Sequence, residues 1–232
     1  MIDPAIATIA SLTYLTKGIT KPVADELGEM LANHFKSWKA TNLLKILVKA
    51  NGKLALSQDG KLILNPKILF KIAENGSLES ESDIQEMWAG LIVSSTDADE
   101  GILYVEILTS LSKGQAMILQ ETCKNAKVSL SPNGLIYSSL TQFPTTESMK
   151  KTYGSKDIHS LDQALDDLRR KGLIDGGFDI YSDNNSFRLL PTPLALHFFA
   201  RVSGYNDSVK FFKLHKKKSK SLKQKSEVVR DK

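Results

Sequence analysis

The tightest group of side chains that could do chemistry is the acidic cluster Asp97, Asp99 and Glu100. Carboxylate oxygens are the ligands that Ca²⁺ and Mg²⁺ prefer in proteins. The cluster lacks the glycine and the downstream glutamate that a calcium-binding loop carries at fixed spacing. We therefore interpret it as an exposed turn between two helices, and a metal-dependent nuclease that uses Asp97 and Asp99 stays the alternative.

The other reactive side chains stand alone in the sequence. His34 has no second His, Cys or carboxylate at metal-ligand spacing, which favours a histidine at the edge of the core. A further helix is expected to begin at Ser112, with Gln115 as its capping-box partner. Cys123, the one cysteine, falls on the apolar side of this helix, which predicts a buried and unreactive thiol. Glycine-rich phosphate loops, serine nucleophile elbows and zinc quartets are missing. The sequence predicts a non-enzymatic protein without a metal or cofactor.

The acidic cluster Asp97, Asp99 and Glu100 lies between two helices expected over residues 82–112. Ser82 is the expected N-cap, with Gln85 as its capping-box partner. Large apolar side chains then recur at i, i+3, i+4, i+7 and i+8, which places them on one helical stripe. The stripe consists of Ile84, Met87, Trp88, Leu91 and Ile92, and Tyr104, Ile107, Leu108 and Leu111 repeat it in the second helix. Neither helix can bury its stripe alone, so the remaining chain must cover both.

The same region resembles a known family. The matching runs are Asn-Pro-Lys-Ile-Leu-Phe-Lys-Ile-Ala at 65–73, Ile-Gln-Glu-Met-Trp-Ala-Gly-Leu-Ile at 84–92 and Glu-Ile-Leu-Thr-Ser-Leu-Ser at 106–112. They resemble the abortive infection alpha family of bacterial phage-defence proteins, over about residues 20–125 and more weakly afterwards. The resemblance implies a role in infection-triggered defence, and the family has no catalytic signature that would imply a chemistry.

Further elements are expected before the central pair. An apolar run at 5–15 predicts a core helix, with a membrane-surface helix as the alternative, because the run is too short to span a bilayer. One long helix, or two in register, is expected from Pro22 to about Lys49, ending at Asn51-Gly52. Residues 53–64 predict a small β-hairpin because Asp59-Gly60 is a favoured hairpin turn. A short helix follows at 66–76.

The second half of the chain has a different pattern. A helix is expected at 135–140, an exposed polar segment at 145–155 and a helix at 158–168 that ends at Lys171-Gly172. Alternating apolar residues then predict two strands around a turn at 182–185, and Thr192-Pro193 opens a closing helix. Helix, helix, hairpin and helix in this order are typical of a winged-helix module.

If residues 157–171 formed a DNA-recognition helix, its outward face would meet the major groove and its phosphates. That face presents Lys156, His159, Gln163 and Arg170, with Asp166 and Asp167 beside them. Those two carboxylates would repel a DNA backbone. We therefore interpret the module as a protein-contact unit, and DNA binding by this face is the alternative.

The positive charge lies at the C-terminal end. The chain carries a net charge of +5. Residues 210–232 contain ten Lys or Arg and two acids, a net +8, and residues 1–209 contain 21 Lys or Arg and 24 acids, a net −3. Aromatics among these lysines could stack on bases or enter an anionic lipid surface. The candidate contact residues are Lys210, Phe211, Phe212, Lys213, Lys216, Lys217 and Lys218. A solvated tail without a ligand is the alternative.

We therefore expect a mostly α protein. It comprises a helical domain with a small β-hairpin (1–126), a winged-helix-like α+β module (127–208) and a basic tail (209–232). The expected function is non-enzymatic phage defence through a phage or host protein partner, with nucleic acid binding through the tail, and a DNA-binding regulator is the alternative. One unpaired cysteine suits the cytoplasm. No transmembrane segment is expected, and homo-oligomerisation is left open.

Overall fold

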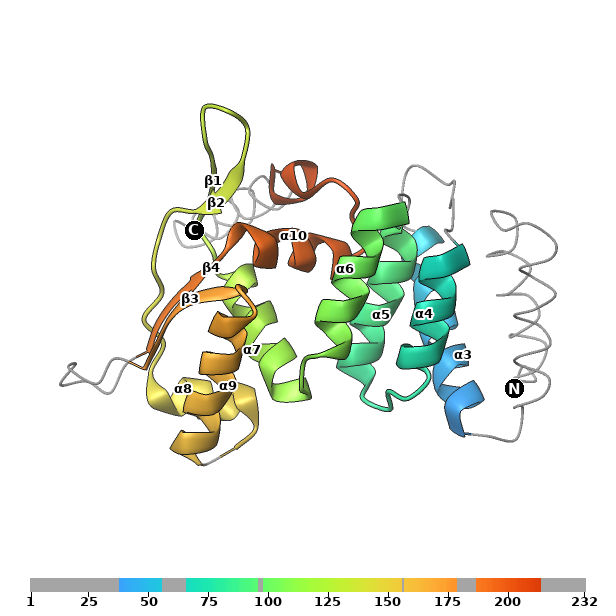
Figure 1. The fold of residues 1–232 in the computed structure, drawn as a ribbon, viewed down its shortest axis with the longest axis horizontal. Helices are drawn as coiled ribbons and strands as arrows, with labels where there is room; N and C mark the ends of the chain where they lie inside the picture. The colour runs from blue at the N-terminus through green and yellow to red at the C-terminus, as the bar shows by residue number, and fades with distance from the viewer. Residues whose placement is uncertain (1–37, 56–65, 96–97, 156, 179–186, 214–232) are drawn as a thin grey trace, which may run out of the picture. The chain divides into compact units, whose positions relative to one another are not determined.

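The computed structural model describes residues 38–55, 66–95, 98–155, 157–178 and 187–213 (Figure 1). Within these ranges the protein is mostly helical and has two small antiparallel hairpins, which confirms the predicted fold class. The chain divides into two compact units. Unit 1 comprises Met1–Ile118, Thr152–Gly154 and Arg201–Asn206, and unit 2 comprises Leu119–Lys151, Ser155–Ala200 and Asp207–Lys232. The boundaries predicted from the sequence at 126 and 208 stay predictions.

Unit 1 is a group of helices around α5. Its elements are α3 (Trp38–Ala55), α4 (Pro66–Gly76), α5 (Ser82–Ser94), α6 (Ala98–Thr109) and the first part of α7 (Lys113–Lys124). Helices α3, α4 and α6 all contact α5. Every member of the stripe predicted around Trp88 is buried. The predicted central helical pair is therefore confirmed and forms the core of this unit. The second stripe is one residue shorter than predicted, because α6 ends at Thr109 and Leu111 lies beyond it, half-buried.

Three polar contacts join α5 to other parts of unit 1. Glu86 pairs with Lys49 at 2.7 Å and with Lys53 at 3.1 Å. Arg201 is buried and donates from Nη1 to the main-chain oxygen of Ser94 at 2.7 Å. Its guanidinium also lies 5.5 Å from the centre of the Tyr104 ring. Arg201 therefore binds a carbonyl at the C-terminal end of α5, where the helix dipole favours a cation.

The predicted end of the long helix is wrong. Helix α3 continues through Gly52 to Ala55, so residues 53–55 are helical and do not form the predicted first strand. The extra turn is stabilised because it buries Leu54 and brings Lys53 to Glu86. The rest of the predicted hairpin lies outside the described residues, as do His34 and the helix predicted at 5–15.

The predicted cap of α5 is also wrong. Ser82 is already helical, and its hydroxyl accepts a hydrogen bond from Lys49 Nζ at 3.1 Å. Gln85 does not reach back to it, because its Nε2 donates to the main-chain oxygen of Glu79 at 2.9 Å. Lys49 lies on α3 and Glu79 in the loop before α5, and neither contact belongs to the capping-box pattern.

The acidic turn is shorter than predicted. Helix α6 begins at Ala98, so Asp99, Glu100 and Gly101 are helical. Gly101 is buried, and a Cβ there would lie 2.3 Å from Cδ1 of Ile68 in α4. The absence of a side chain at Gly101 thus lets the first turn of α6 approach α4 closely. Asp97 lies outside the described residues.

Helix α7 begins with the capping box predicted from the sequence. The Ser112 N–H donates to Gln115 Oε1 at 2.9 Å, and the Gln115 N–H donates to Ser112 Oγ at 3.3 Å. Two main-chain donors of the first turn are thereby satisfied. The prediction was reliable here because both partners are local.

Unit 2 contains two hairpins and helices. Its elements are β1 (Val128–Leu130), β2 (Ile136–Ser138), α8 (Thr146–Tyr153), α9 (Ile158–Arg170), β3 (Ile174–Phe178), β4 (Phe187–Pro191) and α10 (Pro193–Val202), and the last residues of α8 and α10 belong to unit 1. The strands pair as β1 with β2 and β3 with β4, both antiparallel. Helix α9 packs on β3, and the main chain at Gln142 bridges to Leu189 in β4.

Two predictions in this unit are wrong. Residues 136–138 form β2 and not a helix, because burial alternates from Ile136 to Tyr137 to Ser138 with the period of a strand. Residues 146–153, expected to be an exposed polar segment, form α8, whose Met149 is buried.

The end of α9, the second hairpin and the closing helix agree with the structure. Helix α9 ends before Gly172, which adopts φ +69°, a value that glycine tolerates. The second hairpin and the closing helix α10 are confirmed, although the predicted turn at 182–185 lies outside the described residues. Thr192 caps α10 by accepting from the Ala195 N–H at 3.2 Å. The winged-helix assignment stays a prediction.

Candidate interaction site

Helix α9 carries one of the two surfaces that the sequence predicted as candidates for a contact, the other being the basic tail. Asp157 caps it by accepting from the N–H groups of Ser160 at 3.0 Å and His159 at 3.2 Å. Hydrogen bonds from the Ser160 hydroxyl and from these N–H groups hold the pKa of Asp157 below its ordinary value. On the inner side Leu161, Leu165 and Leu168 are buried. The cap and the apolar side together fix which face of α9 meets solvent.

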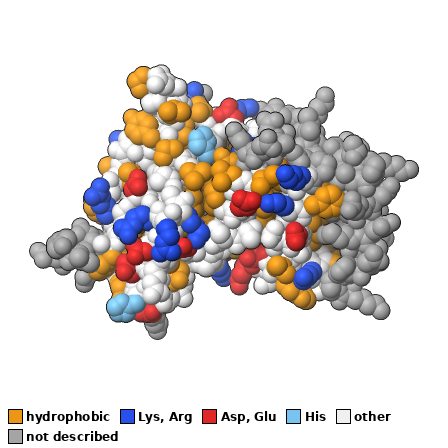
Figure 2. Space-filling model, viewed as in Figure 1, with side chains coloured by type: hydrophobic (Ala, Val, Ile, Leu, Met, Phe, Trp, Pro, Cys, Tyr) orange, Lys and Arg blue, Asp and Glu red, His pale blue; other side chains and the backbone are white. Residues whose placement is uncertain are grey.

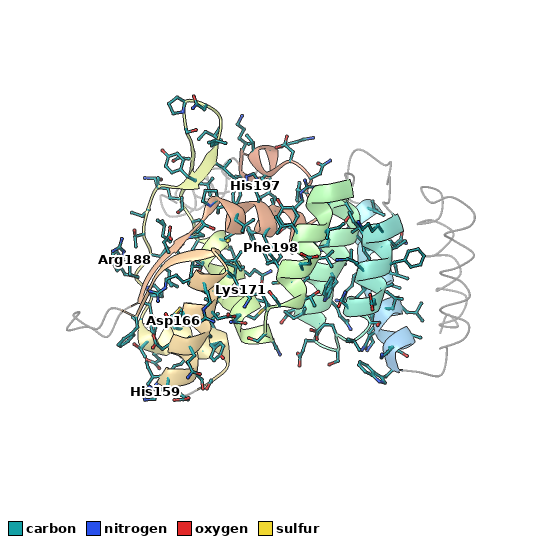
Figure 3. The ribbon with its side chains drawn as sticks, viewed as in Figure 1. His159, Asp166, Lys171, Arg188, His197 and Phe198 are labelled. Carbon is teal, nitrogen blue, oxygen red and sulfur yellow. The ribbon has the colours of Figure 1, made fainter. Side chains whose placement is uncertain are left out.

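The structure brings most of the predicted face together. His159, Gln163 and Arg170 are all exposed, and their spacing places them along one side of α9. Figure 3 shows His159 at the N-terminal end of the helix and Lys171 just beyond its C-terminal end. Lys156, the fourth predicted member, lies outside the described residues.

The bases near the end of α9 are paired with carboxylates of the same helix. Arg169 contacts Asp166 at 2.7 Å, Arg170 contacts Asp167 at 3.8 Å, and Lys171 also pairs with Asp167. In the space-filling view, Lys and Arg side chains lie beside Asp and Glu side chains over this part of unit 2 (Figure 2). We call Asp166, Asp167 and Arg169 to Lys171 the mixed-charge face.

Arg188 is a further exposed base that the sequence reasoning missed. It lies on β4, between the buried residues Phe187 and Leu189 (Figure 3). A Cβ at Gly176 of β3 would lie 2.0 Å from the Arg188 main-chain oxygen, and Gly176 has φ +101°. The alternation of burial along β4 was the signal that could have identified Arg188 as outward-facing.

The first residues of the predicted tail are helical and packed. Residues 208–213 are helical, and the Asp207 side chain caps this turn by accepting from the Lys210 N–H at 2.9 Å. Phe211 is buried, with its ring 5.6 Å from that of Phe199 and 4.9 Å from that of Phe212. The ring of Phe211 is therefore a core element and is not presented for stacking on a base.

The charged residues of this predicted site are placed differently. Lys210 and Lys213 are exposed, and Phe212 is half-buried. Lys216, Lys217 and Lys218 lie outside the described residues. The structure thus describes two of the five predicted lysines, both on the surface of the helical turn.

A Ser–His contact joins the same turn to α10. His197 Nδ1 lies 2.9 Å from the Ser208 hydroxyl oxygen. Ser208 is buried and His197 half-buried, so the contact holds the turn against the helix. The hydroxyl lies too deep for a nucleophile that must meet a substrate.

The remaining candidates for chemistry are placed as follows. Cys123 is buried, its Sγ lies 3.5 Å from the main-chain oxygen of Ala195, and burial raises the pKa of its thiol, as predicted for a core cysteine. Among the described residues, no three His, Cys, Asp or Glu are grouped so that they could hold a metal ion. The described helices are all too short or too polar to cross a membrane.

These features define a mostly helical protein whose second unit displays a mixed-charge face. The family model described as abortive infection alpha matches residues 40–222, and the chain belongs to this family. The match confirms the resemblance and extends it through α9, the second hairpin and α10. Searches of curated proteins and of solved structures give no match.

Proposed function

We propose that this abortive infection protein acts in phage defence by binding a protein partner through the mixed-charge face. The observation that carries this proposal is the pairing of Arg169, Arg170 and Lys171 with Asp166 and Asp167. The role in phage defence is inferred from the family assignment. The contact with a protein is inferred from the mixture of bases and carboxylates on this face.

A polyanion is a poor match for this face. Phosphates gain affinity from unpaired bases, whose binding releases counterions from the nucleic acid. Here Arg169 and Arg170 are each paired with a carboxylate of the same helix. A nucleic acid that approached these bases would bring its phosphates close to the two carboxylates, which would repel them. A protein surface can instead offer carboxylates to Arg170 and cations to Asp166 at the same time. Arginine is also the charged residue most enriched at protein interfaces.

Charge reversal at Arg170 tests this proposal. Its side chain is 76% exposed and lies in the last turn of α9, three residues after its acid partner. Lys124 is a matched control, because it is 68% exposed, lies in the last turn of α7 and follows its partner Glu121 by three residues. The two changes alter net charge equally and disturb similarly weak ion pairs.

We expect Arg170→Glu to lose protection in a phage plating assay at unchanged expression, and Lys124→Glu to keep it. Equal protection by both variants would contradict the proposed face. DNA binding could also be measured. If the affinity for DNA falls steeply with salt and is lost in Arg170→Glu but not in Lys124→Glu, the partner of this face is nucleic acid and not protein. We place the activity in the cytoplasm because the single cysteine needs no oxidising compartment.

A further inference from the structure

The segment that follows the first hairpin runs antiparallel to β4. Gln142 and Leu189 exchange main-chain hydrogen bonds of 2.8 and 2.9 Å. This register sets the next residue, Phe143, opposite Arg188. The Gln142 side chain points inward, because its Nε2 donates to the main-chain oxygen of Thr122 at 2.7 Å. Successive side chains of an extended segment alternate, so Phe143 points outward.

Phe143 and Arg188 are both exposed on the outward side of this small sheet. Phe143 is 63% exposed, which is unusual for a ring of this size. Arg188 is the exposed residue between two buried neighbours on β4 (Figure 3). Residues opposite each other in an antiparallel pair have Cβ atoms about 4.5–5.5 Å apart. An aromatic ring and a guanidinium are therefore neighbours on the surface of unit 2.

The position of β3 opposite Arg188 carries no side chain. Gly177 pairs with Arg188, and a Cβ at Gly177 would meet nothing within 4 Å. In the part of the chain that the structure describes, Arg188 makes no ion pair, whereas Arg169 and Arg170 each pair with an acid. Asp175, the acid of β3, lies two positions further along the ladder. The charge of Arg188 is therefore available to an anionic ligand.

A second cation and aromatic ring share one face of the first hairpin. Tyr137 lies opposite Ser129, and the Ser139 N–H donates to the Lys127 C=O at 2.9 Å, so Lys127 and Tyr137 lie on the same face. Lys127 is exposed, and Tyr137 is 40% exposed. Tyr137 and Phe143 are six residues apart, which is at most about 20 Å along an extended chain. One short polymer can therefore reach both pairs.

We propose that these two pairs bind single-stranded nucleic acid. Each nucleotide carries a flat nucleobase and an anionic phosphate, so it offers a partner to a ring and to an adjacent cation. Phe143 stacks on an unpaired nucleobase, and Arg188 binds a neighbouring phosphate through its forked N–H donors. Tyr137 and Lys127 hold a second nucleotide in the same way. In a duplex the nucleobases stack on one another, so their faces are not available to these rings. The site uses no residue of the mixed-charge face.

Two substitutions test the pair of Phe143 and Arg188. Phe143→Leu keeps an apolar side chain and removes the ring, and Phe143→Tyr is its control because it keeps the ring. Arg188→Gln removes the guanidinium. Lys151→Gln is the control for charge, because Lys151 is an exposed cation of α8 in the same unit. All three positions are on the surface, so circular dichroism should show unchanged folding.

The measurement is fluorescence anisotropy of labelled oligothymidine and of its RNA counterpart, oligouridine, with the full chain. A salt concentration of about 0.15 M weakens contacts made by charge alone. We expect the wild type to bind the single strands more tightly than an oligothymidine–oligoadenosine duplex. The dissociation constant for the single strands should rise about tenfold in Phe143→Leu and in Arg188→Gln, and stay unchanged in Phe143→Tyr and Lys151→Gln. A wild type that does not bind single strands, equal affinity for the duplex, or equal effects of Arg188→Gln and Lys151→Gln would overturn the proposal.

Discussion

Gly90 lies in the middle of α5, where the main chain of Val202 reaches the helix surface. A Cβ at this position would lie 1.8 Å from the Val202 carbonyl oxygen and 2.3 Å from its carbonyl carbon, both within unit 1. Real Cβ atoms essentially never approach other atoms closer than 3.0 Å. Because the obstructing atoms are main chain, no side-chain rotation can relieve the contact in a Gly90→Ala variant.

Two opposing terms set the size of the effect. Replacing a helical glycine by alanine favours folding by about 1 kcal/mol. Forcing one extra methyl group into a packed site costs about 1–3 kcal/mol, and displacement of main chain belongs at the upper end. The steric cost of about 3 kcal/mol exceeds the gain in helix propensity of about 1 kcal/mol. We therefore expect Gly90→Ala to lower the free energy of unfolding by about 2 kcal/mol in total.

Gly52 provides the matched control. It lies in α3, is exposed, and a Cβ there would meet nothing within 4 Å. Gly52→Ala should therefore raise the free energy of unfolding by about 0.5–1 kcal/mol. Urea denaturation followed by circular dichroism would measure both variants. A Gly90→Ala variant as stable as the wild type would show that Val202 does not pack on α5 as described.

Three further changes test other contacts. Arg201→Met should lower the free energy of unfolding by about 2 kcal/mol, because a charge-assisted hydrogen bond to α5 is lost. Thermal denaturation measures this loss, with Arg201→Lys as the comparison. An unchanged midpoint in Arg201→Met would contradict the predicted loss. Burial raises the pKa of Glu86, but hydrogen bonds and charge from its two lysines outweigh this and lower it. Its stabilisation is therefore present above the unfolded pKa and lost as pH falls through the lowered folded pKa. Glu86→Gln should cost less than about 1 kcal/mol at pH 7, and this cost should shrink as the pH of the urea titration is lowered through the acidic range. Cys123 should react with a thiol reagent only after denaturation, and rapid labelling of the native protein would refute its burial.

Local periodicity was sufficient to predict the core helices of unit 1. The spacing of Ile84, Met87, Trp88 and Leu91 depends only on the geometry of one helix, and all four are buried. The extension of α3 could not be predicted in the same way. It depends on burial of Leu54 by other helices, which a local pattern of glycine and asparagine does not report.

The first hairpin of unit 2 was missed because its strands are three residues long. A segment of that length carries too few positions to separate a strand period from a helix period. The strands are defined by pairings across the turn, Val128 with Ser138 and Leu130 with Ile136. The local spacing of apolar residues in this segment does not report these pairings.

The candidate site was predicted in part. The face of α9 followed from helical spacing, and the structure adds the pairs that Asp166 and Asp167 make. Phe211 was misleading because an aromatic residue among lysines looks like a flexible contact segment. Its burial depends on the ring of Phe199, twelve residues away along the chain, and is not visible in local composition.

We infer that the mixed-charge face binds a protein during infection. The most direct measurement is capture from phage-infected cells with the full chain, with Arg170→Glu and with Lys124→Glu, each repeated after nuclease treatment. We expect a protein whose capture survives nuclease treatment. The wild type and Lys124→Glu should retain this protein, and Arg170→Glu should lose it. Retention by all three chains, or loss of the captured material after nuclease treatment, would contradict it.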